Sequence, residues 1–325
     1  MSWCEEPDGE HSGGGVVDAA QRPGETRLVT AGALPLRVGV VILPDRRWVE
    51  AEPAWRLADH MVFDHAWTYD HLTWRSFRDS TWHAATPTLA AAAMVTQRIR
   101  LGTLVASPNF RHPLTLAKEL IALDDLSGGR ITLGVGAGGS GWDATMLGRE
   151  AWSPGERADR FEELVTMTHQ LLVEPAPTIH GRYYAVVEAR THPGCVQEPR
   201  LPFAVAATGP RGMTLAAEYG QAWVTTGDGR HEGPLLDPRR GADVVRRQMD
   251  RVDAACEAID REPGSLDRLV LLGLTLDQCL SSREAFVDAA GTYAAAGVTD
   301  LVVHWPRADE PFQTSLATFE SIFGY

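Results

Sequence analysis

The chain has 325 residues, a length that suits one large barrel or two ordinary domains. Hydrophobic residues make up 44% and charged residues 22%, the usual balance of a soluble globular protein. The net charge of −13 argues against a nucleic-acid partner, because phosphates would be repelled. No run approaches the ~18 apolar residues of a membrane helix, and the acidic start lacks the features of a signal peptide. We therefore expect a cytoplasmic protein with neither a membrane nor a nucleic-acid partner.

Cysteine and lysine usage narrows the chemistry further. The four cysteines form no C-x-x-C pair and have no zinc-ligand spacing, so we expect free thiols and no metal site. Lys118 is the only lysine, which excludes any chemistry that needs a second one.

Residues 1–33 are rich in Gly, Glu, Asp and Ala and show little apolar periodicity, which predicts a mobile tail. From Leu36 onward, short apolar runs without strict alternation recur, as expected of strands buried on both faces. The predicted strands cover residues 36–43, 65–70, 101–107, 130–136, 202–208, 222–227, 266–276 and 299–305.

Amphipathic helix patterns separate these strands. They cover residues 82–97, 112–126, 155–172, 209–220, 238–260, 282–297 and about 310–323. Strands that alternate with helices run parallel, so we expect an α/β fold and, at this strand count, a single (β/α)8 TIM-type barrel over residues 34–325. A doubly wound sheet remains the alternative. Residues 173–201 are dense in Pro and Gly and predict an insertion, either a functional loop or a small hairpin.

The active site of such a barrel lies at the carboxyl ends of its strands. The second predicted strand ends in Asp70-His71, with Trp74 close behind. This pair offers an anionic acceptor and a group that titrates near neutrality. Taken alone, a surface turn with an incidental histidine explains it equally well. Several of the ten tryptophans also lie near strand ends, where most would simply pack and some would suit a planar ligand.

The fourth predicted strand runs into a glycine-rich segment, residues 134–141, that matches G-x-G-x-x-G. A dinucleotide site would need a helix to start at once. Here the next helix begins near Gly155, and no acidic residue ends a following strand at the expected distance. We instead expect glycines at this position to let a flat ring lie against bare backbone.

The fifth predicted strand runs into Thr208-Gly209-Pro210-Arg211-Gly212, which opens a helix. Free amides at a helix start, a hydroxyl and an arginine suit a phosphate group. An ordinary Gly-Pro helix start is the alternative.

Taken in order, five motifs resemble the luciferase-like monooxygenase superfamily over roughly residues 36–325. This superfamily contains FMN-dependent monooxygenases and reductases or dehydrogenases that depend on a deazaflavin, coenzyme F420. The motifs are DHL (70–72), GTLVASPNFRHP (102–113), DDLSGGRITLGVGAG (124–138), GERADRFEE (155–163) and AATGPRG (206–212). The resemblance implies a TIM-type barrel with the cofactor ring over the strand ends, and a homodimer.

The resemblance to the deazaflavin branch also assigns roles. It implies a non-prolyl cis peptide behind the ring, at Leu104–Val105, and catalysis by His71 beside the aromatic wall of Trp74. Cofactor contacts fall on the strand ends and the loops after them, namely Asp70, Leu104, Val105, Ser107, Gly136, Ala137, Gly138, Gly139, Ala207, Thr208, Gly209, Pro210 and Arg211.

Two departures limit the transfer. The sugar-phosphate dehydrogenases of this branch carry an acidic catalytic residue where this chain has Gly139, and they hold the substrate phosphate with lysines. We therefore expect a substrate other than a sugar phosphate. Loops near residues 72–82, 139–153 and 173–201 would form its pocket.

The leading hypothesis is hydride transfer between coenzyme F420 and an unidentified organic substrate, with His71 handling a proton. An FMN-dependent monooxygenase served by a separate flavin reductase is the main alternative. A catalytically silent flavin-binding barrel is a third, against which the intact Asp70-His71 pair argues.

Overall fold

The computed structural model describes residues 34–228 and 235–324, so the tail predicted at residues 1–33 lies outside the described part. Eight parallel strands close into a barrel in the order β1-β10-β9-β8-β7-β4-β3-β2, which confirms the predicted fold. The barrel strands are β1 (Arg37–Val41), β2 (His65–Thr68), β3 (Arg100–Thr103), β4 (Ile131–Gly136), β7 (Phe203–Ala206), β8 (Ala222–Thr225), β9 (Asp267–Leu271) and β10 (Asp300–His304).

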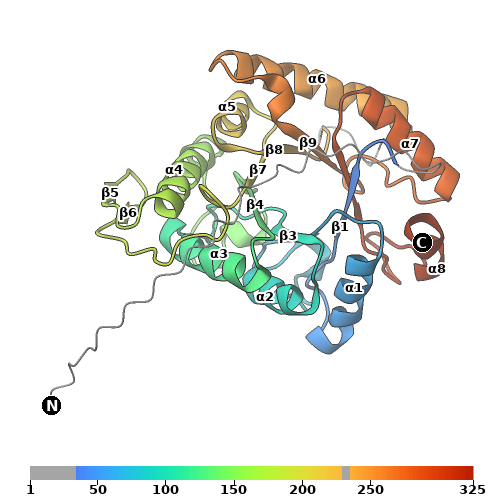
Figure 1. The fold of residues 1–325 in the computed structure, drawn as a ribbon, viewed down its shortest axis with the longest axis horizontal. Coiled ribbons are helices and arrows are strands. Elements are labelled where there is room, and N and C mark those ends of the chain that lie inside the picture. The colour runs from blue at the N-terminus through green and yellow to red at the C-terminus, as the bar shows by residue number, and fades with distance from the viewer. Residues whose placement is uncertain (1–33, 229–234, 325) are drawn as a thin grey trace, which may run out of the picture. The chain divides into compact units, whose positions relative to one another are not determined.

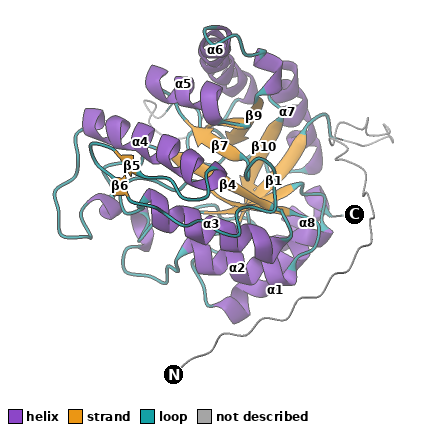
Figure 2. Cartoon of the chain, turned by 60° about the vertical axis from the view of Figure 1, so that its left-hand side comes forward, coloured by secondary structure: helices purple, strands orange, loops and turns teal. Residues whose placement is uncertain are grey.

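Helices surround this barrel, as Figures 1 and 2 show. They are α1 (Trp48–His60), α2 (Ala85–Val95), α3 (Pro113–Ser127), α4 (Pro154–Val173), α5 (Pro210–Tyr219), α6 (Pro238–Glu257), α7 (Arg283–Ala295) and α8 (Leu316–Phe323), with short 3-10 helices η1 (Arg75–Phe77), η2 (Trp142–Ala144) and η3 (Pro263–Ser265). None of the described helices is long and apolar enough to cross a membrane.

The structure corrects several predicted boundaries. Helix α1 was not among the helix patterns named from the sequence, and Pro53 lies inside it. Pairing after Thr103 reduces to a single bridge between Ala106 and Val135, so β3 is shorter than predicted. Helix α8 begins six residues later than expected, where the Ser315 hydroxyl accepts from the Thr318 amide and caps it.

The insertion at residues 173–201 holds a small antiparallel hairpin, β5 (Ile179–His180) and β6 (Ala185–Val186), which lies outside the barrel beside α4 (Figures 1 and 2). The Glu163 carboxylate of α4 anchors it by accepting the amides of Tyr183 and Tyr184. The insertion was predicted to be either a functional loop or a small hairpin, and the hairpin is confirmed.

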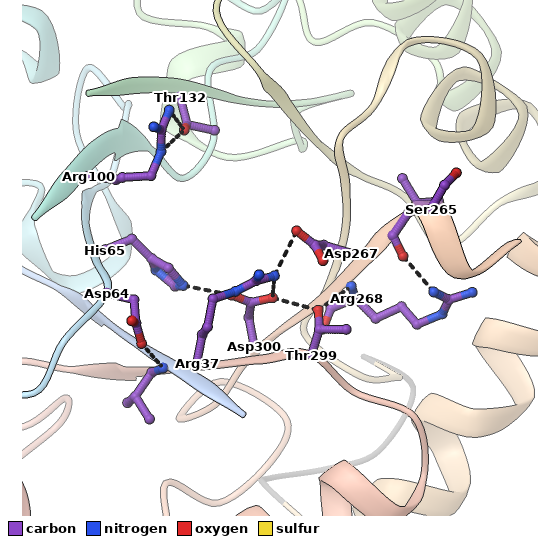
Figure 3. A network of polar contacts seen from close by, with 12 residues as sticks. Arg37, Asp64, His65, Arg100, Thr132, Ser265, Asp267, Arg268, Thr299 and Asp300 are labelled. Atoms are coloured by element: carbon purple, nitrogen blue, oxygen red, sulfur yellow. Dashed lines mark hydrogen bonds and ion pairs between the residues drawn. The ribbon is translucent and has the colours of Figure 1, made fainter. Parts of the chain in front are cut away.

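The amino-terminal end of the barrel is closed by a polar network built from the first residues of the strands (Figure 3). Arg37 donates to both oxygens of Asp300 at 2.7 Å and also pairs with Asp267. His65 Nε2 donates to Asp300 at 3.0 Å, because its Nδ1 already accepts from the indole of Trp67. This network leaves the opposite end of the barrel for a ligand.

Candidate active site

A cavity of about 560 Å³ opens at the carboxyl ends of β3, β4, β7 and β8. Its volume lies in the range of small-molecule sites. Most of the residues predicted to bind a cofactor line it together: Val105, Ser107, Gly136, Ala137, Gly138, Gly139, Ala207, Thr208, Gly209, Pro210 and Arg211. The cavity wall also includes His71, so the structure brings the predicted proton-handling residue and the predicted cofactor contacts to one place.

Glycines make one wall of the cavity flat. A Cβ on Gly136 would come within 2.8 Å of a Val105 methyl, and Gly138 has a φ of +70°, which side chains rarely adopt. The Asn109 amide donates to the Gly139 carbonyl at 3.0 Å and holds the loop after β4. The glycine segment therefore forms a bare backbone surface, as a flat ring would require.

The peptide bond between Leu104 and Val105 is cis, which confirms the geometry that the resemblance implied. Val105 faces the cavity, whereas the Leu104 side chain is buried in the barrel interior. Ser107 lies on the same segment and lines the cavity.

The far end of the cavity meets the start of α5. Gly209 is the N-cap residue and offers no side-chain cap, so the first amides of the helix keep their hydrogen-bonding capacity. Amides in this position bind phosphate well. Arg211 lines the cavity as predicted, yet its guanidinium pairs with Asp159 and Glu162 of α4, at 2.7 Å each. Its contact with a phosphate stays a prediction.

His71 is held at the other end of the cavity by a residue that sequence reasoning missed. Its Nδ1 forms a short hydrogen bond to Asp143 of η2, and its own carbonyl accepts from the Trp82 indole at 2.9 Å. The His71 side chain is 29% exposed, whereas that of Asp143 is only 5% exposed. The imidazole is therefore fixed on one edge and open to the cavity on the other.

Asp70 lies outside the cavity lining. It is 1% exposed, and both of its oxygens accept from Arg111, at 2.9 and 2.6 Å. Arg111 in turn donates to Glu119 at 2.8 Å. The structure thus gives Asp70 a protein partner, and a direct hydrogen bond to a cofactor stays a prediction.

Trp74 also lies away from the cavity lining, in an aromatic cluster formed by the loops after β2 and β10. Its ring stacks with Phe77, Trp82 and Phe312 at centroid distances of 6.1–6.2 Å. It also meets the edge of Tyr69 at 5.0 Å. Trp74 is 8% exposed, so its catalytic role remains a prediction that this geometry does not support directly.

Behind this cluster, the Tyr69 hydroxyl and His304 Nε2 lie 2.7 Å apart. Burial lowers the pKa of His304 to about 3, and the positive charge of Arg75 adds to the shift. His304 is therefore neutral at physiological pH, and its ring stacks on Phe312 at 3.4 Å. We regard it as part of the packed cluster.

Residues 34–310 match the family described as luciferase-like monooxygenase. The chain belongs to this family. An F420-dependent glucose-6-phosphate dehydrogenase of Beutenbergia cavernae is 38% identical over 296 residues, which cover 78% of this chain and 86% of that protein. A 4-hydroxyprotoasukamycin monooxygenase of Streptomyces nodosus subsp. asukaensis is 33% identical over a stretch that covers 71% of this chain and 56% of that protein.

Solved structures share the luciferase-like fold at lower identity. An F420-dependent secondary alcohol dehydrogenase, in complex with an F420-acetone adduct, superposes with a TM-score of 0.69 at 16% identity. The match covers 83% of this chain and 93% of that chain, and it shows the fold.

Three residues of this luciferase-like site were not identified from the sequence: Asp143, Asn109 and Arg111. Each acts on a predicted site residue from a different loop. The sequence did offer a signal for Asp143, since it is an acidic residue in the loop after β4. Loops that follow parallel barrel strands meet at one face, so this residue could have been expected near His71. Among the described residues, no group of three or more His, Cys, Asp and Glu side chains is placed to hold a metal ion.

Proposed function

We propose that this barrel is an F420-dependent oxidoreductase that moves a hydride between the deazaflavin and an organic substrate. One observation carries the proposal: a single imidazole faces a glycine-walled cavity that ends at an uncapped helix start. Relatives named as F420-dependent dehydrogenases support the choice of cofactor.

The lining residues suit such a cofactor in both of its parts. The backbone of Gly136–Gly139 and the Val105 side chain offer a flat, largely apolar wall for a ring. Pro210 has no N–H, so the first amides of α5 that can donate to a phosphate are those of Arg211 and Gly212. These segments would hold the cofactor with the ring end toward His71.

When bound, the deazaflavin supplies the hydride acceptor or donor that the protein itself lacks. The protein contributes orientation and proton transfer. His71 would take the hydroxyl proton of an alcohol as it is oxidised, or return a proton to a carbonyl oxygen as it is reduced. His71 and Arg211 are the only titratable side chains that line the cavity in the part of the chain that the structure describes.

We propose a substrate other than a sugar phosphate, although five relatives are named for glucose 6-phosphate. Lys118 lies on α3 and contacts the carbonyls of Arg190 and His192, outside the cavity lining. Arg307, after β10, is paired with the nearly buried Asp45. Neither cation lines the cavity, and Gly139 provides no carboxylate.

An FMN-dependent monooxygenase with a separate flavin reductase is the second candidate. The observation that favours it is the 33% identity to a relative named as a monooxygenase. A flat glycine wall would accept the ring of F420 or that of FMN, so the shape of the wall does not decide between the two cofactors.

Titration of the purified protein with F420 and with FMN, following quenching of ligand fluorescence, tests the proposal. We expect F420 to bind more tightly than FMN. A matched Gly209→Asp variant should fold normally, because no atom lies within 4 Å of the added Cβ and aspartate is a good N-cap. It should bind F420 at least ~10-fold more weakly, since its carboxylate repels phosphate. Tight FMN binding without a response to F420 would reverse the assignment.

We also propose a homodimer that works in the cytoplasm, with one barrel domain over residues 34–325. Light scattering of the full chain would measure the dimer directly. A monomer at micromolar concentration would contradict this part alone.

A further inference from the structure

Asp143 is held more firmly than a surface carboxylate would be. Its Oδ1 accepts the amide of Leu72 at 2.7 Å and that of Thr73 at 3.4 Å, while Oδ2 faces Nδ1 of His71. It is 4% exposed. The carboxylate thus joins the loop after β4 to the loop after β2, and backbone donors fix its orientation.

This arrangement decides which nitrogen of His71 carries the proton. An ionised carboxylate only accepts hydrogen bonds, so the proton of a neutral His71 lies on Nδ1. The lone pair then lies on Nε2. Among the described residues, no hydrogen-bond partner of Nε2 is found, and the ring lines the cavity.

We propose that Asp143 is a positioning residue that holds His71 as the Nδ1–H tautomer, so that Nε2 acts as a base toward a substrate hydroxyl in the cavity. The inference rests on the proposed function. In the step it assigns, the O–H bond of the substrate breaks and the proton bonds to Nε2. The resulting imidazolium is stabilised by the Asp143 carboxylate, and the same proton returns when the reaction runs toward the alcohol.

The pairing with Asp143 would select one of the two neutral tautomers. Without a partner, Nδ1 and Nε2 compete for the proton, and the wrong tautomer would present an N–H to the substrate hydroxyl instead of a lone pair. The edge-on contact with Tyr69, at a centroid distance of 6.1 Å, fixes the plane of the ring but selects neither nitrogen. Asp143 supplies that selection.

The test is the ¹H–¹⁵N spectrum of histidine-labelled full chain at about pH 9, where unperturbed imidazole is neutral. The signals of His71 are assigned by their loss in His71→Gln. We expect the Nδ1–H pattern in the wild type and a large shift toward Nε2–H in Asp143→Asn. Asp125→Asn removes an exposed carboxylate of α3 and is the control, with no expected change.

An Nε2–H pattern in the wild type would overturn the inference whether or not the variant folds. An unchanged pattern in a folded Asp143→Asn protein would overturn it too. The spectrum needs no cofactor, so failure to bind F420 would count against the proposed function and leave the tautomer result standing.

Discussion

Arg211 of α5 and Asp159 of α4 form an ion pair of 2.7 Å at the edge of the cavity, and Glu162 holds the other guanidinium nitrogen. The hydrogen bonds that Arg211 donates to Glu162 and Asp159 raise the pKa of Arg211. The positive charge of Arg211, in the first turn of α5, is therefore neutralised by two carboxylates before any ligand arrives.

Removing one of these carboxylates should tighten anion binding. We expect Asp159→Asn to bind F420 about 3- to 10-fold more tightly at low salt, with the gain fading as salt rises. Fluorescence titration at two ionic strengths measures it. Glu320→Gln removes the same charge from exposed α8 and should change nothing. Equal gains in both variants would mean that only net charge matters.

His71 should affect turnover without affecting cofactor binding. We expect His71→Ala to bind F420 like the wild type and to lose about 10²–10⁴-fold in kcat on any substrate that the wild type oxidises. The absorbance of the deazaflavin follows the reaction. Unchanged turnover would remove His71 from the mechanism, whereas lost binding would make it a cofactor contact.

Asp300 should make stability depend on acid pH. Burial alone would raise its pKa, but hydrogen bonds from Arg37 and His65 outweigh burial and hold the pKa below its usual value. A lowered folded-state pKa stabilises the protein above the unfolded value, near pH ~4, and this contribution is lost as pH falls further.

Asp300→Asn should therefore cost about 1–3 kcal/mol at pH 7, because it leaves partners in the network unsatisfied. The difference from wild type should shrink as the pH falls below ~4. Thermal melts between pH 3 and 7 test both statements. A difference that is constant over this range would show that the charge of Asp300 is not what stabilises the barrel end.

Two glycines differ in how much space surrounds them, so alanine substitutions at the two sites should differ in their effect on stability. A Cβ on Gly134 would lie 1.9 Å from the Thr103 carbonyl, so Gly134→Ala must push β3 and β4 apart and should cost about 1–3 kcal/mol or more. Gly141 has a φ of −75° and open space around it, so Gly141→Ala should change stability by less than ~0.5 kcal/mol. Urea unfolding of the two variants gives the comparison, and similar midpoints would contradict it.

Strand periodicity predicted the barrel because each strand is buried on both faces and therefore consists of a short apolar run. Helix α1 was not predicted, because Pro53 interrupts its helical pattern. In the folded protein the burial of Trp55 stabilises the helix despite that proline. The hairpin could not be chosen over a loop, because its anchor is Glu163 on α4, a contact between segments about 20 residues apart.

The sequence predicted the site best where the backbone forms the wall of the cavity. The glycines after β4 and the start of α5 signal their conformation locally, and they line the cavity as expected. The residues that act through side-chain pairing were missed. Asp143 is hydrogen-bonded to His71, which lies 72 positions away in the sequence, and Arg111 is hydrogen-bonded to Asp70, which lies 41 positions away. Such partners depend on how loops meet in the barrel, which local pattern does not encode.

The aromatic cluster around Trp74 has a consequence for how this fold diversifies. Two features lie at the mouth of the barrel: strands β3, β4, β7 and β8 border the cavity, whereas Trp74, Phe77, Trp82 and Phe312 pack together in the loops after β2 and β10. Val105 lines the cavity and also packs against this cluster. Shortening a cluster side chain would therefore convert core volume into binding volume, at some cost in stability, without touching the glycine wall. Such a change would alter the room for a substrate and leave in place the backbone that would contact a cofactor ring.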